Sequence, residues 1–292
     1  MRGDQDRLLK IRRYNRHLPK LLRQRFSSEG ALERRDFVTS AIAMAGTVLT
    51  GGADRALAQS PREFYQLRKY ALQTGPQLAL AQNYFEQALI PALNRMAMAP
   101  VGAFKLDVGP ETPTYYLLIP ATSVEVLATV DTRLAEDAVF MKSSTAFWGA
   151  PASAPAFVRV ESMLMSAFAG WPKLHAGTLR GEKRIFQLRT YESASYAAHV
   201  RKVQMFNEAE IGIFTRTGLM PVFFGDTLIG PRMPSLTYML TFVDVADLNV
   251  KWTAFVNDPA WKELSHRPQY ADEEIVSNIT NLYLSPLSCS QM

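Results

Sequence analysis

The pattern of apolar and polar positions repeats once along the chain. The aromatic and apolar run Phe64–Tyr70 reappears as Ile185–Tyr191, an offset of 121 residues. The same offset pairs Phe85 with Phe206, Arg95 with Arg216 and Gly109-Pro110 with Gly230-Pro231; an offset of 122 then pairs Tyr116 with Tyr238 and Ala138 with Ala260. A register held over so many positions indicates an internal duplication.

Each copy predicts the order strand, helix, strand, strand, helix, strand. The first strand is short and rich in aromatic residues, and apolar positions at helical spacing follow it. A Gly-Pro-x-x-Pro element then separates two strands and is typical of a tight hairpin. The expected ranges are 64–70, 77–95, 101–108, 114–120, 123–140 and 157–165 in the first copy, and 185–191, 196–216, 222–229, 235–243, 246–266 (with a break at Pro259) and 275–284 in the second.

This order predicts an α+β fold of two ferredoxin-like βαββαβ modules. Two helices cover only one face of a four-stranded sheet, so the apolar faces of the two sheets are expected to pack on each other within one chain. The expected domains are a first module at 59–168, a linker at 169–184 and a second module at 185–292.

The first 58 residues have the pattern of an export signal. Arg34 and Arg35 precede an uncharged stretch rich in Ala, Thr and Gly (37–53), and the small-x-small site Ala56-Leu57-Ala58 follows shortly after it. Paired arginines here match a twin-arginine address, which predicts a periplasmic or secreted protein. The apolar stretch is too short and too weakly hydrophobic for a stable membrane span. Residues 1–30 are long for the start of a signal peptide, and either a true extension or an early start codon explains them.

The overall positive charge belongs to this leader. Residues 1–58 carry twelve Lys or Arg and six Asp or Glu, a net of +6, whereas residues 59–292 carry twenty and twenty-one, a net of −1. Nucleic-acid binding depends on a basic surface, so no nucleic-acid partner is expected. The one cysteine, Cys289, cannot form an intrachain disulfide, and its place near the end predicts a solvated, inert thiol.

The second copy resembles the NIPSNAP family. The residues that carry the resemblance are Phe186–Tyr191, Arg216-Thr217-Gly218 and the segment Trp252–Trp261, with its Trp-x-x-Phe and Asp-Pro-x-Trp signatures. The resemblance covers residues 185–285 well and 64–165 more weakly, since the 122 offset puts Val130 and Val139 where the two tryptophans stand. The resemblance implies a dimeric α/β barrel, here formed within one chain. It does not imply a particular chemical activity.

The strongest candidate for chemistry is a polar stripe on the first strand of each copy. Alternate residues of a strand share a face, so Gln187, Arg189 and Tyr191 point together, as do their counterparts in the first copy. One interpretation is a ligand cavity in which Arg189 holds a carboxylate or enolate. The other is a structural ion pair between the sheets, with a carboxylate such as Glu161 from the last strand.

Other candidates are weaker. His199 lies on the long helix beside Arg201 and Lys202, where a solvated surface is the simpler interpretation, and Trp252 and Trp261 have the spacing of core residues. No His or Cys pattern indicates a metal site, and no cofactor is predicted, with haem on a lone histidine as the alternative. The complete set of ligand-binding candidates is Gln187, Arg189, Tyr191, His199, Arg216, Tyr238, Trp252 and Trp261.

Two functions fit the sequence. The first is an exported, non-catalytic module that binds a small molecule or a protein, with further homo-oligomerisation as an open alternative. The second is a cofactor-free oxygenase or isomerase acting on an enolisable or aromatic molecule in a cavity of the second module. There Arg189 would hold the anion, and Tyr191 or His199 would move a proton.

We predict that the exported protein begins at Gln59, directly after the small-x-small site. N-terminal sequencing of protein recovered from the periplasm is expected to start there or within a few residues. Replacing both Arg34 and Arg35 with Lys should leave the precursor in the cytoplasm, because the receptor reads the paired arginines. Unchanged export of this variant would contradict the assignment.

Overall fold

The computed structural model describes residues 61–177 and 184–292, which belong to one compact unit. Outside the described residues lie the predicted signal residues Arg34, Arg35, Ala56 and Ala58. Residues 178–183 of the predicted linker also lie outside them. Within the described part of the chain no helix is long and apolar enough to cross a membrane.

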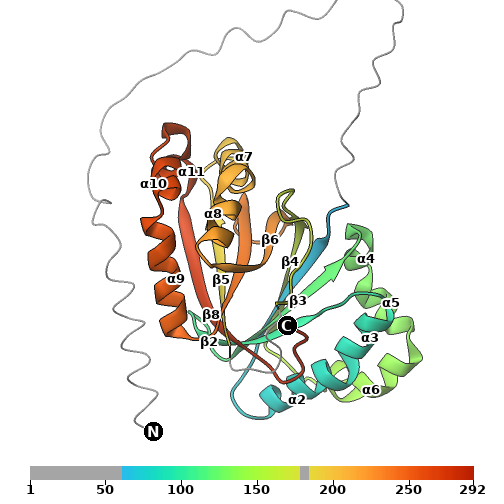
Figure 1. Cartoon of the computed structure of the whole chain (residues 1–292). Coiled ribbons are helices and arrows are strands. Elements are labelled where there is room, and N and C mark those ends of the chain that lie inside the picture. Colours follow the sequence, from blue (N-terminus) through green and yellow to red (C-terminus); the bar gives the residue numbers. More distant parts are fainter. Residues whose placement is uncertain (1–60, 178–183) are drawn as a thin grey trace, which may run out of the picture. The chain divides into compact units, whose positions relative to one another are not determined.

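The fold is a mixed α/β fold around a closed, eight-stranded antiparallel barrel (Figure 1). Around the barrel the strands follow the order β1-β3-β2-β8-β5-β7-β6-β4, and β4 pairs with β1 to close it. The strands are β1 (Phe64–Ala71), β2 (Gly102–Val108), β3 (Thr114–Ala121), β4 (Arg159–Ala167), β5 (Ile185–Glu192), β6 (Met220–Ile229), β7 (Ser235–Phe242) and β8 (Asn278–Pro286).

The helices lie outside the strands, in two groups that follow each other along the chain (Figure 1). Each group opens with a long helix interrupted by one turn of π-helix, Phe85–Leu89 in the first and Phe206–Glu210 in the second. The first group is α2 (Pro76–Tyr84), α3 (Ile90–Arg95), α4 (Val124–Ala128), α5 (Val130–Glu136) and α6 (Ala138–Trp148); the second is α7 (Tyr196–Met205), α8 (Ile211–Arg216), α9 (Val245–Asn257), α10 (Pro259–Ser265) and α11 (Asp272–Ile275), with a 3₁₀ turn at Pro268–Tyr270.

The predicted helix break at Pro259 is confirmed and has a local cause. Helix α9 ends at Asn257, and Asp258 then caps α10, its carboxylate accepting from the backbone N–H groups of Ala260 and Trp261. Proline is well placed at the first position of α10, where its missing N–H would have no intrahelical partner. Asp137 caps α6 in the same way.

Apolar side chains pack on both faces of the barrel wall. Inward-facing residues fill the barrel, with the rings of Tyr65 and Phe223 5.2 Å apart at their centroids. Outward-facing residues such as Tyr70 pack under the first helix group. Phe223 and Phe224 face opposite sides of the wall, since Phe223 belongs to the barrel core and Phe224 stacks on Phe168 and Tyr238.

Two features differ from the sequence predictions. The two sets of four strands are joined edge to edge by hydrogen bonds, through β2–β8 and β4–β6. The apolar faces of the two sets of strands therefore meet in the interior of one closed barrel, and not between two separate sheets. Cys289 is half-buried and packs against the apolar core under the first helices, and burial raises the pKa of its thiol to about 11. The chain end returns to the barrel, where Gln291 accepts a hydrogen bond from the backbone N–H of Val101.

Residues 180–292 expressed alone are expected to self-associate. Without β2 and β4, the edges of β8 and β6 lose their hydrogen-bonding partners and the apolar inner face is exposed to water. Light scattering should detect a dimer or larger species, with residues 59–292 as the control. A stable monomer of the fragment would contradict the dependence of these strands on the rest of the barrel.

Candidate functional site

The polar stripe of the second half faces the helices. Residues Phe186 and Leu188 point into the barrel core, so the alternating residues Gln187 and Arg189 point outward, toward α9. The prediction that Gln187, Arg189 and Tyr191 share a face is therefore consistent with their contacts. The predicted place between two packed sheets is wrong, because the outer face of the wall is covered by helices.

Gln187 is fully buried and its amide is satisfied. Its Oε1 accepts a hydrogen bond from the indole Nε1 of Trp252 on α9, at 2.8 Å. Its Nε2 donates to Oδ1 of Asn281 on β8, at 3.0 Å. The side chain thus ties a helix to two strands, which is a structural role.

Arg189 lies against three aromatic rings. Its Nη2 donates to the hydroxyl of Tyr191 at 2.8 Å, and its guanidinium carbon is 4.8 Å from the centroid of the Trp252 indole. The hydroxyl of Tyr191 is in turn 3.2 Å from that of Tyr238. Burial raises the pKa of Tyr238 well above its ordinary value, although the positive charge of Arg189 opposes the rise. Tyr238 is therefore a protonated phenol at neutral pH.

A buried ion pair lies next to these residues and was not predicted from the sequence. Lys202 Nζ and Glu210 Oε2 are 3.4 Å apart, and both side chains are 2% exposed. Lys202 also lies 5.2 Å from the centroid of the Tyr191 ring. Burial opposes the charge on Lys202, but the carboxylate of Glu210 keeps the pKa of the lysine raised. The signal in the sequence is the comparison of the copies, which puts Ala81 and Leu89 at these two positions.

In the first half, the equivalent arginine is held by a carboxylate. Arg68 is buried, its Nη1 lies 2.9 Å from Oδ1 of Asp131 on α5, and its Nε donates to Oε1 of Gln66 at 2.9 Å. The expected kind of contact, a buried arginine with a carboxylate, is present here. The suggested partner Glu161 is wrong, because its side chain lies on the opposite face of the wall, with Lys69.

The strand register and the helix caps also correct the predicted alignment of the copies. Arg68 pairs with Leu117 and Arg189 with Tyr238, so Leu117 is the counterpart of Tyr238. The offset therefore stays at 121, and the helix caps agree with it (Ser123 with Asp244, and Asp137 with Asp258). Tyr116 and Ala138 are thus not the counterparts of Tyr238 and Ala260.

The corrected offset changes what stands opposite each tryptophan. Asp131 corresponds to Trp252, and Phe140 corresponds to Trp261, in place of the valines given by the 122 offset. Hence the carboxylate that pairs with Arg68 and the indole that stacks on Arg189 occupy the same position of the fold.

Three candidates lie apart from this cluster. His199 is buried, and its Nε2 lies 2.7 Å from Oδ1 of Asp226, so the predicted solvated position is wrong. Arg216 is exposed and pairs with Asp258 at 2.7 Å, which fixes the start of α10. Trp261 packs on Phe255, with ring centroids 4.4 Å apart. In the described ranges no group of three or more His, Cys, Asp or Glu side chains is placed to hold a metal ion.

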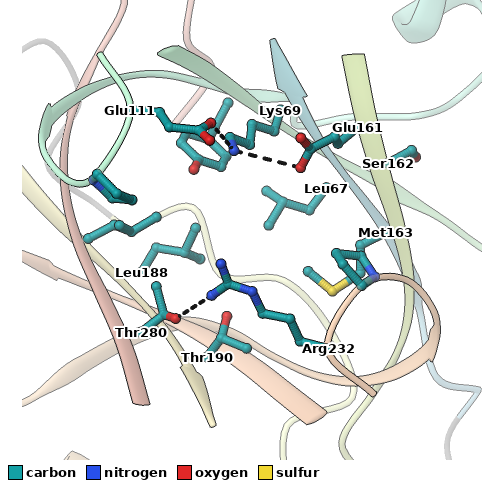
Figure 2. A pocket seen from close by; sticks show the side chains of 14 residues that line it. Leu67, Lys69, Glu111, Glu161, Ser162, Met163, Leu188, Thr190, Arg232 and Thr280 are labelled. Atoms are coloured by element: carbon teal, nitrogen blue, oxygen red, sulfur yellow. Dashed lines mark hydrogen bonds and ion pairs between the residues drawn. The ribbon is translucent and has the colours of Figure 1, made fainter. Parts of the chain in front are cut away.

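A cavity of about 310 Å³ opens at one end of the barrel (Figure 2). We call it the barrel mouth. Its floor is apolar, with Leu67, Leu188 and Leu282 from three strands. Its rim includes both Gly-Pro hairpins, through Pro110-Glu111 and Pro231-Arg232. No local sequence pattern indicates this site, because its lining alternates with the stripe residues and comes from both halves of the chain.

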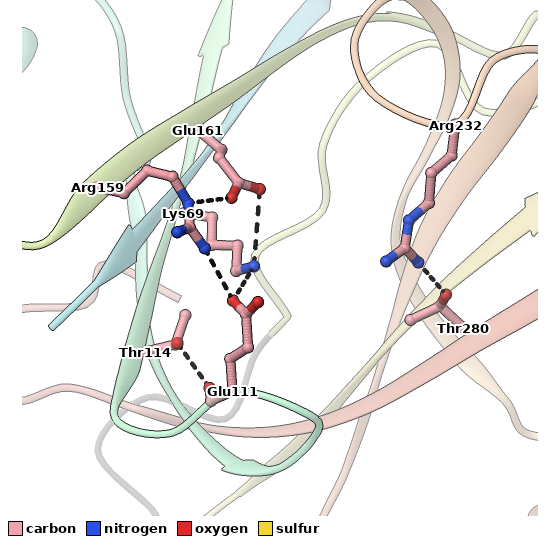
Figure 3. A network of polar contacts seen from close by, with 7 residues as sticks. All are labelled: Lys69, Glu111, Thr114, Arg159, Glu161, Arg232 and Thr280. Carbon is pink, nitrogen blue, oxygen red and sulfur yellow. Dashed lines mark hydrogen bonds and ion pairs between the residues drawn. The ribbon is translucent and has the colours of Figure 1, made fainter.

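The two sides of the mouth carry different polar groups (Figure 3). On one side Lys69 and Arg159 each contact both Glu111 and Glu161, at 2.5–3.6 Å. On the other, Arg232 Nη1 donates to Thr280 Oγ1 at 2.7 Å. The hydrogen bond from Lys69 lowers the pKa of Glu111.

Tyr116 adds a neutral polar group to the mouth. Burial, together with the nearby carboxylates of Glu111 and Glu161, raises the pKa of Tyr116 to about 12. Its hydroxyl therefore keeps its proton at neutral pH and can donate a hydrogen bond.

Comparisons with known proteins identify a family model and solved structures that are similar to this chain. The NIPSNAP family model matches residues 186–291. No curated protein matches the sequence. A proposed monooxygenase from Fusobacterium nucleatum subsp. nucleatum superposes with a TM-score of 0.53 and 6% identity, over 78% of this chain and 93% of that one.

Two further structures extend the comparison. A proposed monooxygenase from Lactobacillus acidophilus NCFM gives a TM-score of 0.52 and 9% identity, over 77% of this chain and 94% of that one. A NIPSNAP-like domain protein from Burkholderia xenovorans is 20% identical, over 36% of this chain and 86% of its own, with a TM-score of 0.32. The two monooxygenase-like structures share the fold of this chain.

We expect the two arginine contacts to respond differently to salt. Double-mutant cycles with Arg68→Met and Asp131→Asn, and with Arg189→Met and Trp252→Leu, should each give a coupling energy of about 1 kcal/mol. Raising NaCl from about 0.1 M to about 1 M should weaken the first coupling, because Asp131 is 62% exposed and is screened. The second should persist, because the indole of Trp252 is buried. Urea unfolding measures both, and equal salt sensitivity would contradict the contrast.

Proposed function

We propose, from the match of residues 186–291 to the NIPSNAP family model, that the protein is an exported, non-catalytic module that binds a small molecule in the barrel mouth. The observation that carries the proposal is the cavity itself, an apolar floor under a charged rim. Ligand sites in proteins are mostly apolar clefts of about 300–1,000 Å³ with a few placed polar groups. The mouth falls at the small end of this range.

The charged side chains Arg189 and Lys202 each have partners within the protein. They therefore need no ligand, which leaves the mouth as the better candidate for a binding site. Arg189 stacks on Trp252 and donates to Tyr191, and Lys202 pairs with Glu210. These contacts account for the buried charges as parts of the fold. Arg189 does not line the mouth, because the neighbouring residues Leu188 and Thr190 take the inward-facing positions.

We also infer that the barrel consists of two ferredoxin-like modules within one chain. The support is the strand order, which reads β4-β1-β3-β2 and then β8-β5-β7-β6, together with π-helical turns and helix caps at a constant offset. In this interpretation the mouth lies between the modules and needs both of them. The proposal that the protein is exported rests on the paired arginines Arg34 and Arg35 and on the Ala56-Leu57-Ala58 site.

A cofactor-free oxygenase or isomerase is the second candidate. The observation that favours it is the chain of polar atoms from Arg189 through Tyr191 to Tyr238, which could hold an enolate and move a proton. The name of the two monooxygenase-like structures points the same way. In this case Tyr191→Phe should stop conversion of a bound molecule, whereas a binding protein returns the molecule chemically unchanged.

Filling the mouth tests the proposed function. Native mass spectrometry of protein purified from its own periplasm should show a co-purified small molecule in the wild type. Thr190→Trp should remove it, because Thr190 lines the mouth and an indole there would occupy the space. The matched control Thr253→Trp, on the exposed side of α9, should retain it. Retention of the molecule by Thr190→Trp would place its site elsewhere.

A further inference from the structure

We propose that the ligand of the barrel mouth is a small monocarboxylate, with its carboxylate bound by Arg232 and its apolar body on the floor formed by Leu67, Leu188 and Leu282. This inference rests on the proposed function, since it names the class of molecule that the same cavity takes. The position of Arg232, the charges around it and the apolar floor support it.

Arg232 is held at the edge of the mouth by its backbone. It lies in the hairpin between β6 and β7, with φ of 63°, a left-handed conformation that residues other than glycine adopt infrequently. Its guanidinium points into the cavity, beside Thr190 and Thr280 (Figure 2). Residues in such sparsely populated backbone conformations cluster at ligand and active sites, where the surrounding structure holds them.

The geometry of its contacts leaves one edge of the guanidinium facing the cavity. The hydrogen bond to Thr280 and the 3.7 Å contact with Oε1 of Glu192 both use Nη1. A carboxylate can therefore approach the Nη2 and Nε edge, and a planar guanidinium binds a carboxylate through two parallel hydrogen bonds.

The charges of the mouth favour an anion at this point and at no other. Lys69 and Arg159 each lie within 3.6 Å of two carboxylates, Glu111 and Glu161, so their charge is already balanced. Among the described residues, the ion pair of Arg232 is a single and longer one, with Glu192. A second anion near Lys69 would also meet the two glutamates, which repel it. One negative charge on the ligand thus fits, and a dianion does not.

The apolar floor determines the body of the ligand beyond its carboxylate. Leu67, Leu188 and Leu282 come from β1, β5 and β8 and are buried, and Met163 adds a flexible side chain beside them. Burying apolar ligand surface here releases water from the cavity and supplies the main favourable term. The volume of about 310 Å³ limits the body to a medium-length chain or a single ring.

Three probes that share one apolar chain separate the charge from the body. Octanoate, 1-octanol and octylamine differ in their head group, and calorimetry on the mature chain measures the affinity of each. Octanoate should bind at least about tenfold more tightly than octanol, as expected for charge-assisted hydrogen bonds, and octylamine should bind most weakly.

Variants assign the effect to Arg232. Arg232→Gln should lower octanoate affinity about tenfold and leave octanol unchanged, whereas Arg232→Lys, which keeps the charge without the planar fork, should lose less. Arg159→Gln, which removes a cation paired with Glu111 and Glu161, is the comparison variant and should weaken octanoate binding much less than Arg232→Gln. Circular dichroism verifies that each variant is folded.

The outcomes distinguish this inference from the proposed function. If octanol binds as tightly as octanoate, or if Arg232→Gln changes neither, the carboxylate assignment is overturned while the mouth remains a binding site. If octanoate affinity depends on Arg159 as strongly as on Arg232, the assigned anchor is wrong. Failure of all three probes to bind, together with retention of a co-purified molecule by Thr190→Trp, overturns both proposals.

Discussion

Closure of the barrel is the constraint on which the other features depend. Every strand has two hydrogen-bonded neighbours, so no edge remains and each strand must send successive side chains alternately inside and outside. On β5 this places Leu188 and Thr190 inside, with Arg189 between them facing the helices. One short strand therefore contributes both to the aromatic cluster under α9 and to the mouth, and a shift of one residue in register would exchange the two sets.

The two halves solve the same problem with different chemistry. Each places an arginine between its strands and its own helices, Arg68 against α5 and Arg189 against α9. The first half pairs Arg68 with a carboxylate, and the second stacks Arg189 on the indole that stands at the same position. The second half also buries the Lys202–Glu210 pair. A buried pair of this kind adds little net stability, since desolvation offsets its attraction, yet losing one partner is costly. The second half is therefore less tolerant of change at these positions.

The sequence was sufficient to predict the order of the elements and the shared face of the stripe. Period-two and period-3.6 patterns, together with the Gly-Pro hairpins, are local signals, and a duplication doubles each of them. It was not sufficient to identify what each face meets. The partner of Arg68 comes from a helix 63 residues away, which no periodicity indicates. The 122 offset is misleading because Tyr116 and Tyr238 are both tyrosines, although one faces the barrel and the other the helices.

The hairpins at the mouth carry a consequence of building this barrel from one chain. Two identical subunits around a two-fold axis would present the same tip residue from both sides, and a bound molecule would meet either two acids or two bases. Here equivalent tips bear Glu111 and Arg232. A molecule with different groups at its two ends can thus bind in the cavity in one orientation, which the two hairpin tips determine. Polarity of this kind is available to a single chain because its two tips can mutate independently.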